Sequence, residues 1–247
     1  MPNHDSDVLA PMVRTLQNRS QLAQSDVEAL LGLPHRIGVI DHHRYIVREG
    51  DKASHCTLLL SGFAYRSKMA GNGARQILSF HLRGDVVDLH NTLLEKADHS
   101  VQTLTRVEVA YIPSAAILAL VDAHPAIARA LWRETLVDGS IFREWVLNVG
   151  RRDARQRIAH LLCEIVLRQK QAGLCEGPRY HLPMTQEQIG DATGLTSVHV
   201  NRTLQGMRKE GLISTTNRSV TIEDWRKLQA AGDFSSAYLH QPVASAA

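Results

Sequence analysis

Short apolar runs, separated by glycine and polar residues, fill the chain between about residues 35 and 113. They fall at 44–51, 58–63, 76–80, 84–87 and 107–112. Short apolar runs with turn signals at intervals of roughly ten residues are typical of a β-sandwich or barrel. The turns are expected to use glycines with positive φ, which other residues rarely adopt. These glycines are Gly50, Gly62, Gly71, Gly73 and Gly84.

The pattern changes after residue 113 to helical spacing. Between residues 125 and 148, with no internal proline, apolar residues recur at spacings of four and at multiples of 3.5, which predicts one long helix. Four positions mark its apolar side: Ile127, Leu131, Ile141 and Trp145. Because further apolar residues extend around more than one face, we expect this helix to pack on its own barrel and on a partner helix in a dimer. A helix buried within one domain is the alternative.

Gly150 and residues 151–153 suggest a hinge before a second helix. The apolar stripe of that helix is Ile158, Leu161, Leu162, Ile165 and Val166. Residues 170–183, with two glycines and two prolines, are predicted to form a loop. From Gly232 onward the sequence is small and polar, so we expect a flexible tail.

Two short helices joined by a glycine are predicted next. Thr185 and Gln188 have the capping-box spacing that starts a helix. Gly194 ends this helix and allows a tight turn, and Thr196 is a plausible N-cap for a second helix over 197–209. The two helices form a helix-turn-helix.

Residues 212–222 contain two β-prone runs around a polar turn at 217–219, which we interpret as a wing. An ordinary helical hairpin is the alternative to a DNA-binding motif. The wing, the exposed polar side of the second helix and a local excess of positive charge favour DNA binding.

Candidate DNA contacts lie on and around the second helix. The N-terminal half of a recognition helix meets base edges in the major groove. On this basis the predicted base contacts are Ser197, Val198, Asn201 and Arg202. The fork of Arg202 suits guanine, and Val198 suits a thymine methyl group. The predicted phosphate contacts are Thr185, Thr196, His199 and Arg218.

The charge distribution supports this interpretation more than the net charge does. The net charge is only +3, but residues 151–227 hold 13 Lys and Arg against 8 Asp and Glu. Residues 1–150 are nearly balanced, with 15 against 16. The composition, 44% hydrophobic and 21% charged, is that of an ordinary globular protein.

Several function classes are disfavoured. Cys56, Cys163 and Cys175 are too far apart for an iron–sulfur cluster or a structural zinc site. The start of the chain lacks signal-peptide features, and no stretch approaches the roughly 20 apolar residues of a membrane helix, so we expect a cytoplasmic protein that does not contact a membrane. No catalytic order of Ser, His and Asp, phosphate loop or metal-spaced pair is apparent, so we expect neither an enzyme nor a metal site.

The sequence resembles the Crp/Fnr family of bacterial transcription regulators from about residue 30 to 225. The segments that carry the resemblance are 48–51, 58–62, 84–85, the long helix, 184–202 and 210–213. The resemblance implies an α+β fold with a cyclic-nucleotide-binding-type β-roll, a dimerisation helix and a C-terminal winged helix-turn-helix. The expected domains are 1–118 (β-roll with N-terminal helices), 119–150 (dimerisation helix), 151–230 (winged helix-turn-helix) and 231–247 (flexible tail).

The chain departs from the cAMP-responsive members at the ligand pocket. Asp88 and Leu89 stand where a Gly-Glu pair would bind the ribose, and His99 precedes Ser100 where an arginine would neutralise the cyclic phosphate. Cyclic-nucleotide control is therefore not expected. No cofactor is predicted, although His90 lies near the position of a haem-ligating histidine in the carbon-monoxide-sensing relatives, which leaves haem as an alternative. These five residues form a speculative effector pocket.

The expected function is sequence-specific DNA binding by a homodimer on two-fold symmetric operators, which positions or blocks RNA polymerase. An effector in the β-roll would tune the affinity. The alternative is a ligand-binding regulatory module without DNA function.

Overall fold

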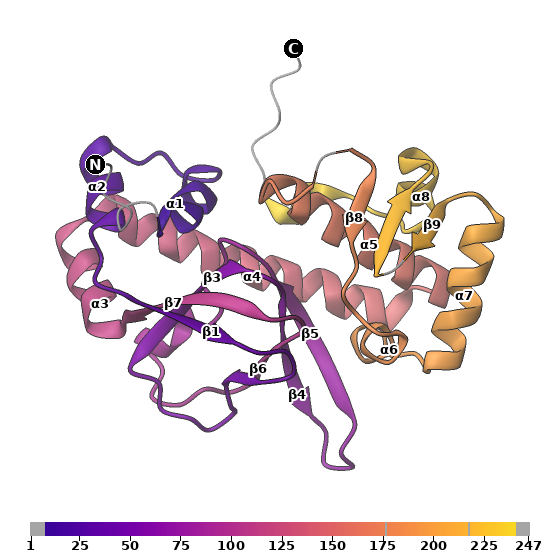
Figure 1. Ribbon diagram of the computed structural model, residues 1–247, viewed down its shortest axis with the longest axis horizontal. Helices are drawn as coiled ribbons and strands as arrows, with labels where there is room; N and C mark the ends of the chain where they lie inside the picture. The colour runs from indigo at the N-terminus through magenta and orange to yellow at the C-terminus, as the bar shows by residue number, and fades with distance from the viewer. Residues whose placement is uncertain (1–7, 176, 217, 241–247) are drawn as a thin grey trace. The chain divides into compact units, whose positions relative to one another are not determined.

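The computed structural model describes residues 8–175, 177–216 and 218–240. The chain divides into two compact units. The described part of the first comprises residues 8–68, 80–139 and 239–240, and that of the second comprises 69–79, 140–175, 177–216 and 218–238. Figure 1 shows the elements of both units.

The β-rich region consists of two sheets, as the run spacing predicted. One has the strand order β1-β7-β3 and the other β2-β6-β4-β5. The bounds are β1 Arg36–Ile40, β2 Tyr45–Val47, β3 His55–Ser61, β4 Ala64–Met69, β5 Arg75–His81, β6 Ser100–Thr103 and β7 Val107–Pro113. The registers of β1 and β3 with β7, and of β2 and β4 with β6, are antiparallel. Successive side chains of a strand point to opposite faces of its sheet. Alternate side chains of the two sheets therefore meet in a shared hydrophobic core.

Two details of the predicted strands are wrong. Residues 84–87 form no strand and contribute a single bridge, Leu58 to Val86. The cause is a local turn, in which the Asp85 carboxylate accepts a hydrogen bond from the Leu82 N–H at 3.1 Å. Of the five predicted glycines, Gly71 lacks a positive φ, because Gly73 (φ 84°) makes the left-handed step of that turn instead.

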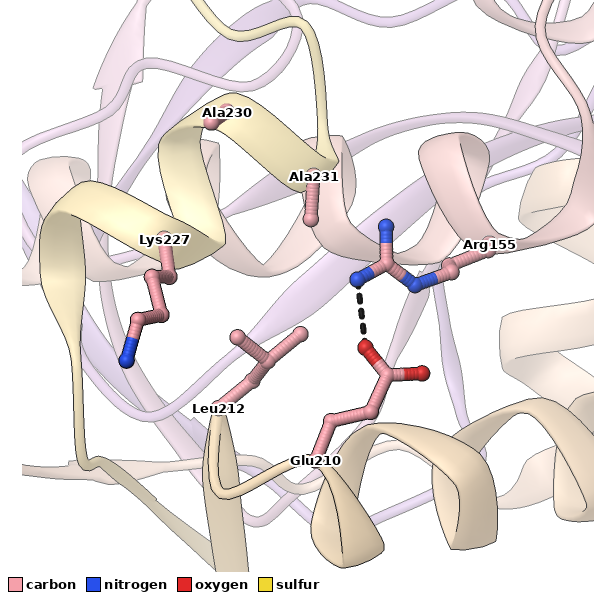
Figure 2. Close-up of a pocket in the computed structure, with 6 residues that line it drawn as sticks. All are labelled: Arg155, Glu210, Leu212, Lys227, Ala230 and Ala231. Carbon is pink, nitrogen blue, oxygen red and sulfur yellow. Dashed lines mark hydrogen bonds and ion pairs between the residues drawn. The ribbon is translucent and has the colours of Figure 1, made fainter.

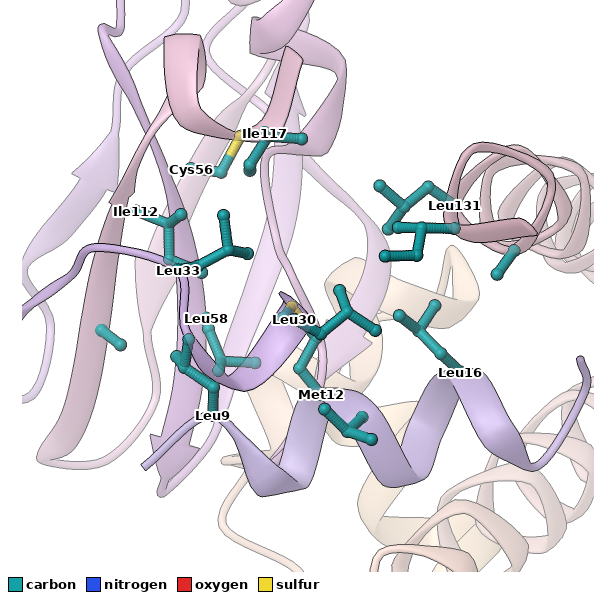
Figure 3. Packing of buried hydrophobic residues seen from close by; sticks show 14 residues of the cluster. Leu9, Met12, Leu16, Leu30, Leu33, Cys56, Leu58, Ile112, Ile117 and Leu131 are labelled. Atoms are coloured by element: carbon teal, nitrogen blue, oxygen red, sulfur yellow. The ribbon is translucent and has the colours of Figure 1, made fainter. Parts of the chain in front are cut away.

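Helices pack on the first sheet and close a hydrophobic core (Figure 3). The helices of this unit are α1 Ala10–Gln17, α2 Gln24–Leu31, the 3-10 helix η2 Leu89–Thr92, α3 Ser114–Ala123 and the first part of α4 Pro125–Arg151. Leu9 and Leu30 from the N-terminal segment meet Leu58 of β3 and Ile112 of β7, and Leu131 of α4 belongs to the same cluster. Burial of these side chains in a common cluster holds the N-terminal helices on the β-roll.

The long helix α4 is confirmed and extends three residues beyond the predicted end. Its predicted marker residues Ile127, Leu131, Ile141 and Trp145 are all buried within the single chain. Their role as dimer contacts stays a prediction. The exposed apolar residues of α4 are instead Trp132, Leu136, Val146 and Leu147. At 100° per residue these four positions share one side of the helix.

The second unit holds the predicted helix-turn-helix and wing. Its elements beyond α4 are α5 Ala154–Gln171, β8 Arg179–His181, α6 Gln186–Thr193, α7 Ser197–Lys209, β9 Ile213–Thr216, β10 Ser219–Ile222, α8 Trp225–Ala231 and the 3-10 helix η3 Ser236–Leu239. The strand order is β8-β10-β9. Strand β8 lies in the segment predicted as a loop, because Tyr180 pairs with Val220 across the sheet. The predicted hinge is reduced to two residues between α4 and α5, where Asp153 caps α5.

The flexible tail was predicted to begin too early. Phe234 and Leu239 are buried, and residues 236–239 form η3. Aromatic packing accounts for this order: the His160 ring lies 5.0 Å from Phe234 and 5.7 Å from Tyr238, between ring centroids. The Tyr238 hydroxyl also donates a hydrogen bond to buried Glu164 at 2.7 Å. Residues 241–247 of the predicted tail lie outside the described residues.

Candidate nucleic-acid interface

The two helices of the candidate interface begin and end where local hydrogen bonding dictates. The Thr185 hydroxyl accepts a hydrogen bond from Gln188 N–H at 3.2 Å, and the Gln188 side chain accepts one from Thr185 N–H at 2.9 Å. Gly194 then adopts the left-handed conformation (φ 67°). The Thr196 hydroxyl accepts from His199 N–H at 3.3 Å and starts α7. The predicted capping box, turn and second cap are all confirmed.

Helix α7 divides into a buried side and an exposed side. Val200, Leu204 and Met207 are buried in the unit. Ser197, Val198 and Arg202, predicted to contact bases, are exposed, and Asn201 is half-buried. Val198 is 77% exposed, which is unusual for an apolar side chain. The structure thus brings the four residues together on the outer side of the N-terminal half of α7, where a recognition helix contacts bases.

The predicted phosphate contacts surround this side of α7. Thr185, Thr196 and Arg218 are exposed and His199 is half-buried. Arg218 has a φ of 59° in the turn of the wing, a conformation rarely adopted outside tight turns. Arg208 of α7 donates a hydrogen bond to Thr215 of β9 at 2.8 Å, which ties the wing to the helix. Asn217, part of the predicted wing turn, lies outside the described residues.

Gln205 is a candidate contact that the sequence interpretation missed. Its side-chain amide donates to Asn201 Oδ1 at 3.4 Å, and Gln205 is exposed one turn after Asn201. The i, i+4 spacing could have revealed it, since such positions are neighbours on a helix surface.

An open pocket in this unit lies away from the predicted contacts. It is lined by Arg155, Glu210, Leu212, Lys227, Ala230 and Ala231 (Figure 2). Arg155 and Glu210 form an ion pair of 2.5 Å, which connects the start of α5 to the end of α7. None of the residues that line the pocket is a predicted DNA contact. We therefore interpret the pocket as a gap left where α5, α7 and α8 pack together, and not as a ligand site.

Gly190→Ala is expected to disrupt the helix-turn-helix. A Cβ atom at Gly190 would lie 2.4 Å from the Leu195 carbonyl oxygen, which is backbone and cannot rotate away. The turn between α6 and α7 must therefore open, at a cost of roughly 1–3 kcal/mol. Chemical denaturation and DNA-binding titrations should both show the loss.

Gly206→Ala provides the matched control for that substitution. Apart from its chain neighbours and the backbone of α7 itself, nothing in the described part of the chain lies within 4 Å of a Cβ at Gly206. Alanine there should preserve or raise stability by about 0.4–1 kcal/mol. Equal destabilisation by the two substitutions would contradict the steric explanation.

The speculative effector pocket separates into two groups in the structure. Asp88 is fully buried and accepts hydrogen bonds from Thr57 N–H at 2.6 Å and from the Thr57 hydroxyl at 3.0 Å. Leu89 packs against the core, and the Ser100 hydroxyl accepts from Glu49 N–H at 3.0 Å. These three residues are engaged in the fold itself. Only His90 and His99 come together, with ring centroids 4.5 Å apart.

The buried Asp88 predicts a pH dependence of stability. Burial raises the pKa of its carboxyl group to about 7, although hydrogen bonds from Thr57 oppose the shift. The folded state therefore binds a proton more tightly than the unfolded state, and Asp88 contributes a stability that is lost as the pH rises from about 4 to about 7. A shift of this size corresponds to a few kcal/mol. Asp88→Asn should remove this contribution. The free energy of unfolding of the variant should therefore rise relative to that of the wild type as the pH increases from about 4 to about 7. Parallel pH profiles of the two unfolding free energies would contradict this expectation.

Both units match models of known protein domain families. A model of the cyclic nucleotide-binding domain matches residues 39–124, and a model of the Crp-like helix-turn-helix domain matches residues 156–231. The transcriptional activator protein FnrL of Cereibacter sphaeroides is 29% identical over 199 residues, which cover 78% of this chain and 79% of FnrL. This chain belongs to the Crp/Fnr family of transcription regulators. The helix-turn-helix around α7 is accordingly the DNA-binding domain of a Crp/Fnr regulator.

Other members show the same correspondence over most of the chain. The nitrogen fixation regulation protein FixK of Azorhizobium caulinodans is 26% identical over 214 residues, which cover 86% of this chain and 84% of FixK. The structure of FixK2 from Bradyrhizobium japonicum superimposes with a TM-score of 0.75 at 24% identity, covering 81% of this chain and 98% of that one. This likeness supports the Crp/Fnr fold. Among the described residues, none of the helices has the length and apolar character required to cross a membrane.

Proposed function

We propose that this Crp/Fnr regulator acts as a homodimer that binds two-fold symmetric operators, with one α7 helix in the major groove of each half-site. The observation that carries the proposal is the outer side of α7. This helix contains Arg202, Arg208 and Lys209 and no carboxylate in its 13 residues. A cationic helix with exposed polar side chains in its first turns suits both phosphate attraction and base readout.

Each exposed side chain of α7 has a distinct role in this proposal. Arg202 places its guanidinium on the O6 and N7 atoms of guanine, and Val198 contacts a thymine methyl group. Asn201 pairs with adenine, and Gln205 holds or extends that contact. The caps Thr185 and Thr196, with His199 and Arg218, bind phosphates and set the register.

Dimerisation is proposed to use the exposed apolar side of α4. Trp132 is 67% exposed, Leu136 58% and Val146 70%, and Leu147 accompanies them. Gly139 and Arg143 occupy the same side, so the apolar stripe is interrupted by one small and one charged residue. Apolar side chains recurring along one helix face suit an isologous contact with the same helix of a second copy.

Regulation in this proposal involves the β-roll but not a cyclic nucleotide. Burial, the charge of Arg66 and the neighbouring His90 lower the pKa of His99 to about 4, against the opposing influence of Asp98. His99 is therefore uncharged near neutral pH and offers a cyclic phosphate no positive partner. We further propose that the dimer acts in the cytoplasm, that it contacts RNA polymerase, and that it has no catalytic role.

Genome-wide mapping of bound sites, followed by mobility shifts with the recovered fragments, tests the proposal. We expect an inverted repeat whose half-sites lie about 10–10.5 base pairs apart, centre to centre. Binding should weaken steeply with salt, because phosphate contacts release counterions. Recovery of single, non-repeated half-sites, or equal affinity for operator and random DNA, would contradict the proposal.

A further inference from the structure

Two histidines nine residues apart in the sequence face each other in the β-roll. His90 belongs to η2, and His99 directly precedes β6. Their ring centroids lie 4.5 Å apart with an interplanar angle of 53°. The segment between them includes the exposed Leu93 and Leu94, so the two imidazoles lie at the two ends of an exposed loop.

Both imidazoles have a buried nitrogen without a partner. Among the described residues, neither His90 Nε2 nor His99 Nε2 has a hydrogen-bond partner, and both atoms are buried. The His99 side chain as a whole is nine-tenths buried, with 6% of the residue exposed. Buried polar atoms in native proteins are nearly always satisfied, so two such atoms in one small volume indicate a ligand.

The hydrogen bond of His99 with Asp98 defines the chemistry of these nitrogens. His99 Nδ1 lies 2.6 Å from Asp98 Oδ1, a carboxylate that can only accept while ionised, so Nδ1 carries the proton and Nε2 has a free lone pair. In this arrangement His99 is a neutral imidazole whose Nε2 can accept a metal ion. Neutral imidazoles with free lone pairs bind metal ions in preference to anions.

We infer that His90, His99 and Asp98 form a binding site for one divalent transition-metal ion. One ligand atom from each of the three residues lies within 4.8 Å of the others. Ligands of a tetrahedral zinc ion are closer, roughly 3.3 Å apart for bonds of about 2.0 Å, so binding requires rotation of these side chains. The Asp98 side chain is 70% exposed, and its hydrogen bond with His99 Nδ1 orients the His99 ring; its carboxylate reaches the ion only once that hydrogen bond opens. Two imidazoles, one carboxylate and solvent suit Zn²⁺, Co²⁺, Ni²⁺ or Fe²⁺.

The charges around the site can accommodate the ion. The charge of Arg66 acts on both histidines, and it would oppose a second positive charge. Its guanidinium is paired with Asp138 of α4 at 2.6 Å. Asp98 and Asp138 both raise the pKa of His90, which shows that negative charge also reaches the site. A bound ion would link η2, which contains His90, to the start of β6, which follows His99. Its positive charge would repel Arg66 and so affect the ion pair between Arg66 and Asp138 of α4.

Metal titration of the full chain tests the site directly. The protein, purified without a polyhistidine tag and treated with chelator, is titrated with Co²⁺ and then with Zn²⁺. We expect one equivalent of Co²⁺ to bind with visible ligand-field absorption, and Zn²⁺ to displace it. His90→Ala and His99→Ala should each lower the affinity at least about 100-fold, and Asp98→Asn about 10- to 100-fold.

Two further variants keep the outcome clear. His42→Ala removes an exposed imidazole elsewhere in the β-roll and should leave binding unchanged. His99→Cys retains a metal ligand, so Co²⁺ binding should persist with an added thiolate charge-transfer band. Absence of stoichiometric Co²⁺ binding by the wild type, wild-type affinity in both alanine variants, or a haem Soret band that depends on His90 would overturn the inference.

A mobility shift with and without Zn²⁺ asks whether the ion regulates DNA binding, a step that rests on the proposed function. We expect Zn²⁺ to change operator affinity several-fold in the wild type and not in His90→Ala. Metal binding without any DNA binding would overturn the proposed function and leave the metal site intact. DNA binding without a Co²⁺ site would do the reverse.

Discussion

Arg202→Ala is expected to weaken operator binding by roughly 1–3 kcal/mol and to relax the preference at one base pair in each half-site. Arg202 is exposed on the outer side of α7. Among the described residues no hydrogen bond or ion pair engages its guanidinium, so the fork is free to bind both acceptors of a guanine. Its removal deletes two directional hydrogen bonds and one positive charge without disturbing the packing of α7.

Fluorescence anisotropy with the operator, with each single-base variant and with random DNA measures this effect. Arg226→Ala, an exposed arginine at the start of α8, is the matched control and should keep wild-type discrimination. Arg218→Ala, at the wing, should instead weaken all DNA sequences alike and reduce the salt slope by about one. An equal loss on operator and random DNA for Arg202→Ala would show that this residue binds phosphate rather than a base.

The helix-turn-helix could be predicted from the sequence because its determinants are local. Thr185 and Gln188 cap each other within three residues, and Gly194 needs only its own freedom of φ to end α6. Such signals do not depend on any distant segment. Gln205 lies one turn beyond the first turns of α7, where base contacts are expected, and only its hydrogen bond with Asn201 marks it as a candidate contact.

Determinants that are distant in the sequence could not be predicted. Helical periodicity marks Leu131 and Trp132 as equally apolar, but only the fold shows that Leu131 joins the core while Trp132 is exposed. The order of the C-terminal segment depends on Tyr238 reaching Glu164, 74 residues earlier. Asp98 was not singled out because its importance comes from the facing ring of His90.

Leu136→Glu is expected to convert the regulator from a dimer to a monomer and to lower its apparent operator affinity at least about 100-fold. Leu136 lies in the middle of the exposed apolar side of α4, between Trp132 and Val146. In an isologous contact the two copies would place their carboxylates in one apolar interface, where an unpaired charge is costly. Each monomer would then bind only one half-site and lose the gain of simultaneous contact.

Sedimentation velocity and operator titration together measure the two effects of this substitution. Leu93→Glu is the matched control, since Leu93 is 83% exposed in the same unit but lies outside α4. It adds the same charge to an exposed leucine and should leave a dimer with wild-type affinity. Raising the concentration of the Leu136→Glu chain should restore part of the binding by mass action, because its helix-turn-helix is unchanged. If the variant sediments as a dimer with full affinity, the exposed side of α4 is not the dimer interface and the two copies must associate through another surface.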